Sequence, residues 1–191
     1  MKWFDYENPK TLSETFELLN KYGDDSRLIA GGTDLIVQMR IGRRTPKVVI
    51  NTKAVDEMNE LTCNSSGLTI GAAVPCYKIY QTPEIISMYP GIIDSASLIG
   101  GIQIQGRATI GGNLCNAAPS ADAVPALIVN RAICNIASSK GTRNIPVEDF
   151  CTGPGQNVLD TDELLVSLSL PKHESNFGSR YIRFIPRNEM D

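Results

Sequence analysis

The chain has 191 residues, of which 42% are hydrophobic and 20% are charged, and its formal net charge is −3. This composition suffices for one sizeable core, or for two small lobes that share one. The charge balance lacks the basic excess of a nucleic-acid-binding protein. No apolar run approaches the roughly 20 residues of a membrane span, and the polar, aromatic start at residues 1–6 does not resemble a signal peptide. We therefore predict a cytoplasmic protein with no nucleic-acid partner and no membrane span.

Cysteine and histidine usage argues against metal and triad chemistry. The five cysteines are widely spaced and form no C-x-x-C pair, which favours reduced structural thiols over zinc or iron–sulfur ligands. His173 is the only histidine. It lies in a polar stretch after Pro171, so we predict a solvated surface position. We expect no metal ligand and no catalytic side chain on this chain.

The first part of the chain predicts a small α/β lobe. Thr11 and Glu14 form a capping box that indicates the start of a helix, and Gly23 indicates its end. The elements expected next are a strand at 28–30, a helix at 35–40 and a strand at 48–50. This order indicates a lobe that covers residues 1–55.

The rest of the chain predicts a larger α+β lobe over residues 56–185. The elements expected there are a strand at 68–70, a helix after Pro75, helices at 91–99 and 121–130, a hairpin of 133–137 with 143–146, and strands at 164–170 and 181–185. Leu and Val alternate with Ser over 164–170, the pattern of a half-buried strand. Residues 186–191 follow without a closing element, so we expect them to begin a C-terminal domain that is otherwise missing.

Two glycine pairs are the candidate binding features. In Ala30–Asp34 a strand runs into Gly31-Gly32 and then into a helix, an arrangement in which backbone amides bind phosphate without a lysine. The alternative is a tight turn capped by Thr33 or Asp34. The segment fits neither the G-x-G-x-x-G fingerprint nor a P-loop.

Thr109–Asn113 is the second glycine-rich loop, with Gly111-Gly112 between small polar residues. Asp122 follows in a small-residue stretch and is suited to accept hydrogen bonds from ribose or ribityl hydroxyls. The alternative is a buried bend that lets the two lobes pack closely. Two such loops in one small chain favour a long dinucleotide ligand between the lobes.

At these residues the sequence resembles the FAD-binding (medium) subunit of the xanthine dehydrogenase family of molybdenum hydroxylases. The resemblance includes both glycine segments and continues through Asn116, Ser120–Asp122, Thr152–Gly155 and Asp162–Leu165. It implies an α+β, two-lobed FAD-binding fold of the vanillyl-alcohol-oxidase (PCMH) type. One departure stands before the second loop, where the family commonly has Gln-Ile-Arg-Asn and this chain has Gln103-Ile104-Gln105-Gly106. Arg107 is the candidate replacement for the missing cation.

The resemblance also implies a set of cofactor-binding residues. The backbone of residues 27–34 would hold the FAD diphosphate, Thr109–Asn113 would hold its other side and the ribityl chain, and Asp122 would bind cofactor hydroxyls. Leu165 and Phe184 would be cofactor neighbours, although plain strand core is the alternative for both. The full set is Arg27, Leu28, Ile29, Ala30, Gly31, Gly32, Thr33, Asp34, Thr109, Ile110, Gly111, Gly112, Asn113, Asp122, Leu165 and Phe184.

The implied function is electron transfer within a heteromeric oxidoreductase of purine metabolism. Electrons from a molybdopterin subunit would pass through 2Fe–2S clusters on an iron–sulfur subunit to FAD on this chain, and then to NAD or another acceptor. Three alternatives remain at this point: a flavin-free scaffold of such a complex, a stand-alone flavin oxidase, and the FAD subunit of a nicotinate-, aldehyde- or carbon monoxide-oxidising relative.

Overall fold

The small lobe contains a three-stranded sheet, and its first long helix begins at the predicted capping box. In the computed structural model, which describes residues 1–184, the Thr11 hydroxyl accepts a hydrogen bond from the Glu14 amide at 3.2 Å, and the Glu14 carboxylate accepts one from the Lys10 amide at 2.6 Å. The elements are β1 (Asp5–Glu7), α1 (Leu12–Tyr22), η1 (Gly23–Asp25), β2 (Ser26–Ile29), α2 (Leu35–Arg40) and β3 (Val48–Asn51). The three strands form a parallel sheet in the order β1-β3-β2, as the expected α/β pattern requires.

The large lobe combines helices with an antiparallel sheet. Its elements up to the second glycine pair are η2 (Asp56–Asn59), β4 (Leu61–Asn64), β5 (Gly67–Gly71), α3 (Cys76–Tyr80), α4 (Pro83–Met88), α5 (Pro90–Leu98), α6 (Ile102–Gln105) and α7 (Ile110–Asn116). The remaining ones are α8 (Ala123–Val129), β6 (Ile133–Ser138), β7 (Gly141–Pro146), η3 (Val147–Asp149), β8 (Cys151–Gly153), β9 (Gln156–Asn157) and β10 (Leu164–Pro171). The five-stranded sheet has the order β4-β5-β10-β6-β7, and β8 and β9 form a separate hairpin.

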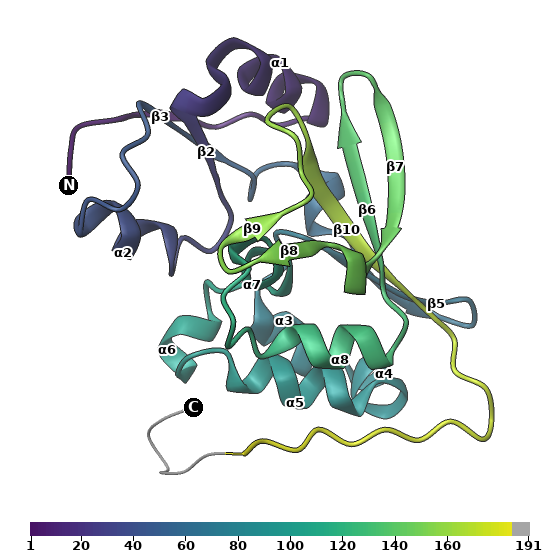
Figure 1. Cartoon of the computed structure of the whole chain (residues 1–191). Coiled ribbons are helices and arrows are strands. Elements are labelled where there is room, and N and C mark those ends of the chain that lie inside the picture. Colours follow the sequence, from purple (N-terminus) through teal and green to yellow (C-terminus); the bar gives the residue numbers. More distant parts are fainter. Residues whose placement is uncertain (185–191) are drawn as a thin grey trace.

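Helices α3, α4, α5 and α8 gather below this sheet, while the β6–β7 hairpin rises beside α1 of the small lobe (Figure 1). There the Asn20 amide donates to the Ser139 hydroxyl at 3.1 Å. Buried side chains of both lobes, such as Ile50 and Leu168, belong to one continuous core, so the lobes share a core. The last strand of the small sheet ends at Asn51, and the first strand of the large sheet begins at Leu61. The predicted domain boundaries at 55 and 185 stay predictions.

Strand β10 is buried on both faces rather than half-buried as predicted. It lies between β5 and β6, and even Ser167 is only 8% exposed. The serines that suggested a solvated face instead accept hydrogen bonds from the Asn135 amide, at 2.9 Å for Ser167 and 2.7 Å for Ser169. Burial of a hydroxyl group that keeps a hydrogen bond costs little free energy. The alternation of Leu and Val with Ser therefore does not identify an exposed face here.

The strand predicted at 181–185 is wrong over its described residues. Residues 172–184 contain no strand and run beneath the helices after β10 (Figure 1), and residues 185–191 lie outside the described part of the chain. Two tyrosine hydroxyls connect the end of β10 and this segment to the helices. Tyr89 donates to the carbonyl of Pro171, the last residue of β10, at 2.9 Å, and Tyr181 donates to the Asp122 carbonyl at 3.1 Å. None of the helices within residues 1–184 is long and apolar enough to cross a membrane.

The prediction that His173 is a solvated surface residue is wrong. Its ring stacks on Phe177 with centroids 3.8 Å apart and lies 4.7 Å from the ring of Tyr89. Its Nε2 is buried and has no hydrogen-bond partner among the described residues. Burial is the main cause that lowers the pKa of His173, the charge of Arg131 adds to it, and a hydrogen bond with the Met88 backbone opposes both.

This environment predicts a pH dependence of folding. The pKa of His173 in the folded protein lies below the ordinary value of 6.5. As the pH falls, the unfolded chain therefore binds a proton at a higher pH than the folded protein does. The contribution of the neutral His173 to the free energy of unfolding is complete above pH 6.5 and is lost as the pH falls below it. We expect His173→Phe, which keeps the ring contacts, to lose less stability than the wild type between neutral and mildly acidic pH. Urea unfolding at a series of pH values measures this, and parallel curves for the two proteins would contradict it.

Candidate functional site: a cleft between two glycine pairs

The first glycine pair forms the predicted turn between β2 and α2. Gly32 has a φ of 78°, which favours glycine. Gly31 is required for a different reason: a Cβ added there would lie 2.4 Å from the carbonyl oxygen of Arg107. The first pair therefore packs directly against the backbone that leads to the second.

The backbone amides of this turn are available to a ligand. Among the described residues no hydrogen bond uses the amides of Gly31, Gly32, Thr33 or Asp34, and the first bond into α2 runs from the Ile36 amide to the Gly32 carbonyl at 3.0 Å. These residues line a cleft between the lobes. Unpaired amides that converge on a cavity attract an anionic group such as a diphosphate.

The second glycine pair lies in a helix, not in a loop as predicted. Thr109 is the N-cap of α7, and its hydroxyl accepts a hydrogen bond from the Gly112 amide at 2.9 Å. A Cβ on Gly111 would come within 2.6 Å of Ala72, so this glycine lets α7 approach the segment after β5. Ile110 is fully buried and forms part of the core.

The two glycine segments are joined by Arg107, whose Nε donates to the Gly31 carbonyl at 3.3 Å. Gln105, at the position of the family's missing cation, is 5% exposed and donates to the Ser97 carbonyl at 2.6 Å. Arg107 therefore contacts the first glycine turn, whereas Gln105 stabilises the connection between α5 and α6.

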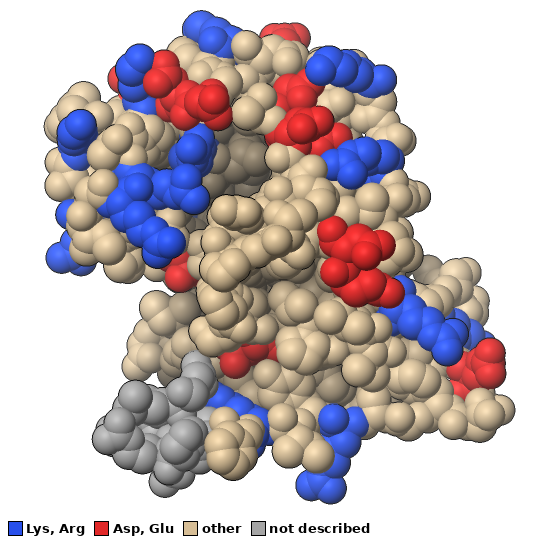
Figure 2. All heavy atoms as spheres, in the orientation of Figure 1, with Lys and Arg blue, Asp and Glu red and all other residues tan. Residues whose placement is uncertain are grey.

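Between the lobes these segments border a cavity of about 640 Å³, within the usual range for small-molecule sites. Figure 2 shows it as a hollow, with basic side chains gathered on the side of α2. The predicted residues on its wall are Arg27, Leu28, Ile29, Ala30, Gly31, Gly32, Thr33, Asp34, Thr109, Gly111, Gly112, Asn113 and Leu165. The structure thus brings together the two glycine segments and Leu165.

Three predicted site residues do not line this cavity: Ile110, Asp122 and Phe184. Asp122 precedes α8, where burial raises the pKa of its carboxyl group and the charge of Arg183 acts in the opposite direction. Phe184 is 89% exposed, which rules out the alternative of strand core for this side chain. As cofactor contacts, Asp122 and Phe184 stay predictions.

Sequence reasoning missed the wall supplied by the β8–β9 hairpin and by α2. Thr152 and Gly155 line the cavity, and the Gly155 amide donates to the Ala117 carbonyl at 2.8 Å. Across the lobes, the Gln38 amide donates to the Asn116 side chain at 2.9 Å, and both residues lie on the wall. The family match at Thr152–Gly155 was the available signal for the hairpin, but Gln38 carried none.

The wall carries charges of both signs, with Asp24, Asp34 and Glu163 beside Arg27 and Arg44. Glu163 has its own partner, because Arg143 donates to both of its carboxylate oxygens at 2.7 Å, and these hydrogen bonds are the main cause that lowers the pKa of Glu163. Arg27 donates to two backbone carbonyls of its own turn. Arg44 also lies on the wall, and no ion pair within residues 1–184 uses its guanidinium.

The wall offers little for nucleophilic or metal chemistry. Cys115 lies on it, but burial raises the pKa of its thiol to about 12, so the group stays protonated at neutral pH. All five cysteines are free. Within the described residues, no three histidine, cysteine, aspartate or glutamate side chains gather as a metal site.

Two lobes that enclose a cavity, with unpaired amides and an arginine on its wall, form a site suited to a ligand that carries phosphate. Comparison with known proteins identifies which kind. Residues 2–173 match the family described as the FAD binding domain in molybdopterin dehydrogenase, so the chain belongs to that family. This confirms the resemblance and FAD as the cofactor of the fold.

Similar proteins come from several molybdenum hydroxylases. The chain is 31% identical to the xanthine dehydrogenase FAD-binding subunit of Escherichia coli O157:H7, over 97% of this chain and 64% of that one. It is also 31% identical to the nicotinate dehydrogenase FAD-subunit of Eubacterium barkeri, over 100% of this chain and 66% of that one. The chain therefore spans just under two thirds of the length of these relatives.

A solved structure shares the fold over nearly the whole chain. The carbon monoxide dehydrogenase of Hydrogenophaga pseudoflava matches with a TM-score of 0.94 and 25% identity, over 99% of this chain and 66% of that one. The relatives thus differ in the substrates for which they are named while they keep this FAD-binding fold.

For FAD, the cavity predicts a role for Arg44. We expect Arg44→Gln to weaken FAD binding about tenfold, because a charge-assisted contact to the diphosphate is lost. Riboflavin has no phosphate, so its affinity should stay unchanged. Arg40→Gln is the matched control, since Arg40 lies on α2 but not on the cavity wall. Flavin fluorescence titration measures all four affinities, and an equal loss for both flavins would contradict the assignment.

Proposed function

We propose that this chain is the FAD-binding electron-transfer subunit of a xanthine or purine dehydrogenase-like molybdenum hydroxylase, with a fold of the vanillyl-alcohol-oxidase (PCMH) type. Bound FAD supplies the redox chemistry, accepting electrons from iron–sulfur clusters and giving them to NAD or another acceptor. The partners are a molybdenum-cofactor subunit and an iron–sulfur subunit. The observation that carries the proposal is the cavity between two glycine segments in a chain of this family.

The residues present fit FAD. The unpaired amides of Gly31–Asp34 and the guanidinium of Arg44 suit the diphosphate, because both favour negative charge. Leu165 lies on the cavity wall but is only 2% exposed, so it contributes little surface to the cofactor. We propose that this chain positions the cofactor and restricts its contact with water, and that none of its side chains needs to act as nucleophile or general base.

The substrate of the complex is expected to be selected on another chain, because the cofactor would occupy this cavity. Two observations favour purines: the relatives include xanthine dehydrogenases and the caffeine dehydrogenase subunit beta of a Pseudomonas species, which is 31% identical over 88% of this chain. The nicotinate dehydrogenase subunit is equally similar, so a nicotinate-oxidising complex is the second candidate.

Purification of the full chain together with its partners tests the proposal. We expect a yellow protein with flavin absorption that co-purifies with molybdenum- and iron–sulfur-containing subunits. Xanthine added to this complex without an acceptor should bleach the flavin bands, and NAD should restore them. Bleaching by nicotinate instead would move the proposal to that substrate. A colourless chain without affinity for FAD would identify a scaffold, and a solitary yellow chain with oxidase activity would identify a stand-alone oxidase.

A further inference from the structure

Helix α2 has four apolar residues out of six. Leu35 faces the cavity and Met39 is 3% exposed, as expected for the inner side of a helix. Yet Ile36 is 44% exposed, Val37 52%, and Ile41 just after the helix 71%. Neighbouring apolar side chains exposed to this extent mark a surface that is suited to be covered in the working assembly.

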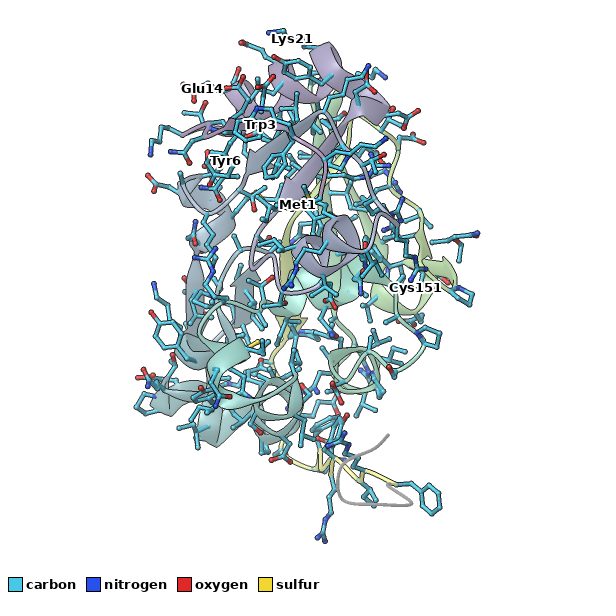
Figure 3. The ribbon with its side chains drawn as sticks, turned by 90° about the vertical axis from the view of Figure 1, so that its left-hand side faces the viewer. Met1, Trp3, Tyr6, Glu14, Lys21 and Cys151 are labelled. Carbon is cyan, nitrogen blue, oxygen red and sulfur yellow. The ribbon has the colours of Figure 1, made fainter. Side chains whose placement is uncertain are left out.

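A second short helix on the same side of the molecule also exposes apolar side chains. Ile102 and Ile104 of α6 are 74% and 40% exposed. Both helices lie on the same side of the molecule, at the left in Figure 1 and turned toward the viewer in Figure 3. The contact between Gly31 and Arg107 joins the turn before α2 to the segment after α6. We call the surface of Ile36, Val37, Ile41, Ile102 and Ile104 the α2–α6 face.

The charges beside the α2–α6 face are mainly positive. Arg40 and Arg43 lie on or directly after α2, Arg107 directly follows α6, and no ion pair within the described residues uses any of them. Basic side chains gather in this region, which carries few acidic ones (Figure 2). The charge is opposite to the chain's net charge of −3. The complementary surface is therefore apolar with carboxylates around it.

The position of this face identifies the kind of partner. Its two helices adjoin the glycine segments that border the cofactor cavity, so a protein on this face comes closer to the flavin than one on the far side of the large lobe. Electron transfer requires that proximity. We propose that the α2–α6 face is the docking surface for the iron–sulfur subunit, through an apolar patch with acidic residues around it. This inference rests on the proposed function.

Matched substitutions test the surface. Val37→Asp and Ile41→Asp place a carboxylate on the face, and Arg40→Glu reverses a charge beside it. None of these three residues lines the cofactor cavity, so FAD content should stay at the wild-type level. Ile86→Asp is the control for Val37→Asp, because Ile86 lies on α4 and is 48% exposed. Lys10→Glu, before α1, is the control for Arg40→Glu.

The measurement is binding of each FAD-loaded variant to the iron–sulfur subunit that co-purifies with the wild type, with the rate of flavin reduction in the reassembled complex as a second readout. We expect Val37→Asp, Ile41→Asp and Arg40→Glu each to weaken binding about tenfold or more, and both controls to bind like the wild type. Higher salt should weaken wild-type binding and affect Arg40→Glu less.

The outcomes separate this inference from the proposed function. If the wild type binds no iron–sulfur subunit, the proposed function fails. If the wild type binds and the face variants bind equally well, the docking surface is overturned while the function stands. If Val37→Asp loses FAD, its binding result is not used. The binding of Ile41→Asp to the iron–sulfur subunit then tests the face, because Ile41 lies beyond the end of α2. A dimer of the isolated chain that the face variants dissociate would assign the face to a second copy and overturn the inference.

Discussion

Replacement of Gly31 by alanine is expected to weaken FAD binding severely. The added Cβ would lie 2.4 Å from the Arg107 carbonyl oxygen and 2.9 Å from its carbon, and backbone on both sides leaves no flexible side chain to yield. The turn must move away from the second glycine segment, which displaces the four unpaired amides at once. We expect at least an approximately hundredfold loss of affinity, together with about 2–3 kcal/mol of folding stability.

Gly106→Ala is the matched control for Gly31→Ala. Gly106 lies just before Arg107, has a φ of −64°, and an added Cβ would meet nothing within 4 Å, so this change should be neutral or stabilise by about 0.5 kcal/mol. Thermal unfolding with and without FAD measures both effects. Excess FAD at about 100 times the wild-type Kd should stabilise the wild type and Gly106→Ala by about 2.7 kcal/mol and Gly31→Ala by no more than about 0.4 kcal/mol. A stabilisation of Gly31→Ala by FAD as large as that of the wild type would refute this account of the turn.

The sequence predicted the parts of the fold that depend on local chemistry. The capping box at Thr11, the turn after β2 and the two-residue β6–β7 turn each depend on residues within a few positions of one another. The same local rules failed at β10, where Asn135 from a neighbouring strand satisfies the serines. They failed again at His173, because Tyr89 and Phe177 build its environment.

The candidate site was predictable where it is made of backbone. Glycine pairs are visible in the sequence without knowledge of the fold. Thirteen of the sixteen predicted residues line the cavity. The side chains that reach the cavity across the lobes were not predictable. Gln38 reads as an ordinary helix residue, and only the fold brings it to Asn116. Arg44 likewise belongs to a polar connection whose direction depends on how α2 packs.

Replacement of Gly111 by alanine is expected to destabilise the chain more than to affect FAD binding selectively. An added Cβ would come within 2.6 Å of the Cα, Cβ and carbonyl oxygen of Ala72, and the Ala72 amide is itself bound to the Val166 carbonyl at 2.9 Å. The segment after β5 therefore cannot yield without a break in its contact with β10. We expect a loss of about 3 kcal/mol, which corresponds to about 6–12 °C in Tm for a chain of this size.

Two further variants separate crowding at Gly111 from other effects of an added methyl group. Gly178→Ala adds the same methyl group in open space and should leave Tm unchanged. Ala72→Gly removes only one of the three crowded atoms, so the double variant should recover part of the loss, and the coupling between the two positions should be clearly non-zero. If instead the two changes are additive, α7 does not pack against Ala72 as described. Partial recovery would establish that Gly111 is required because α7 packs against Ala72.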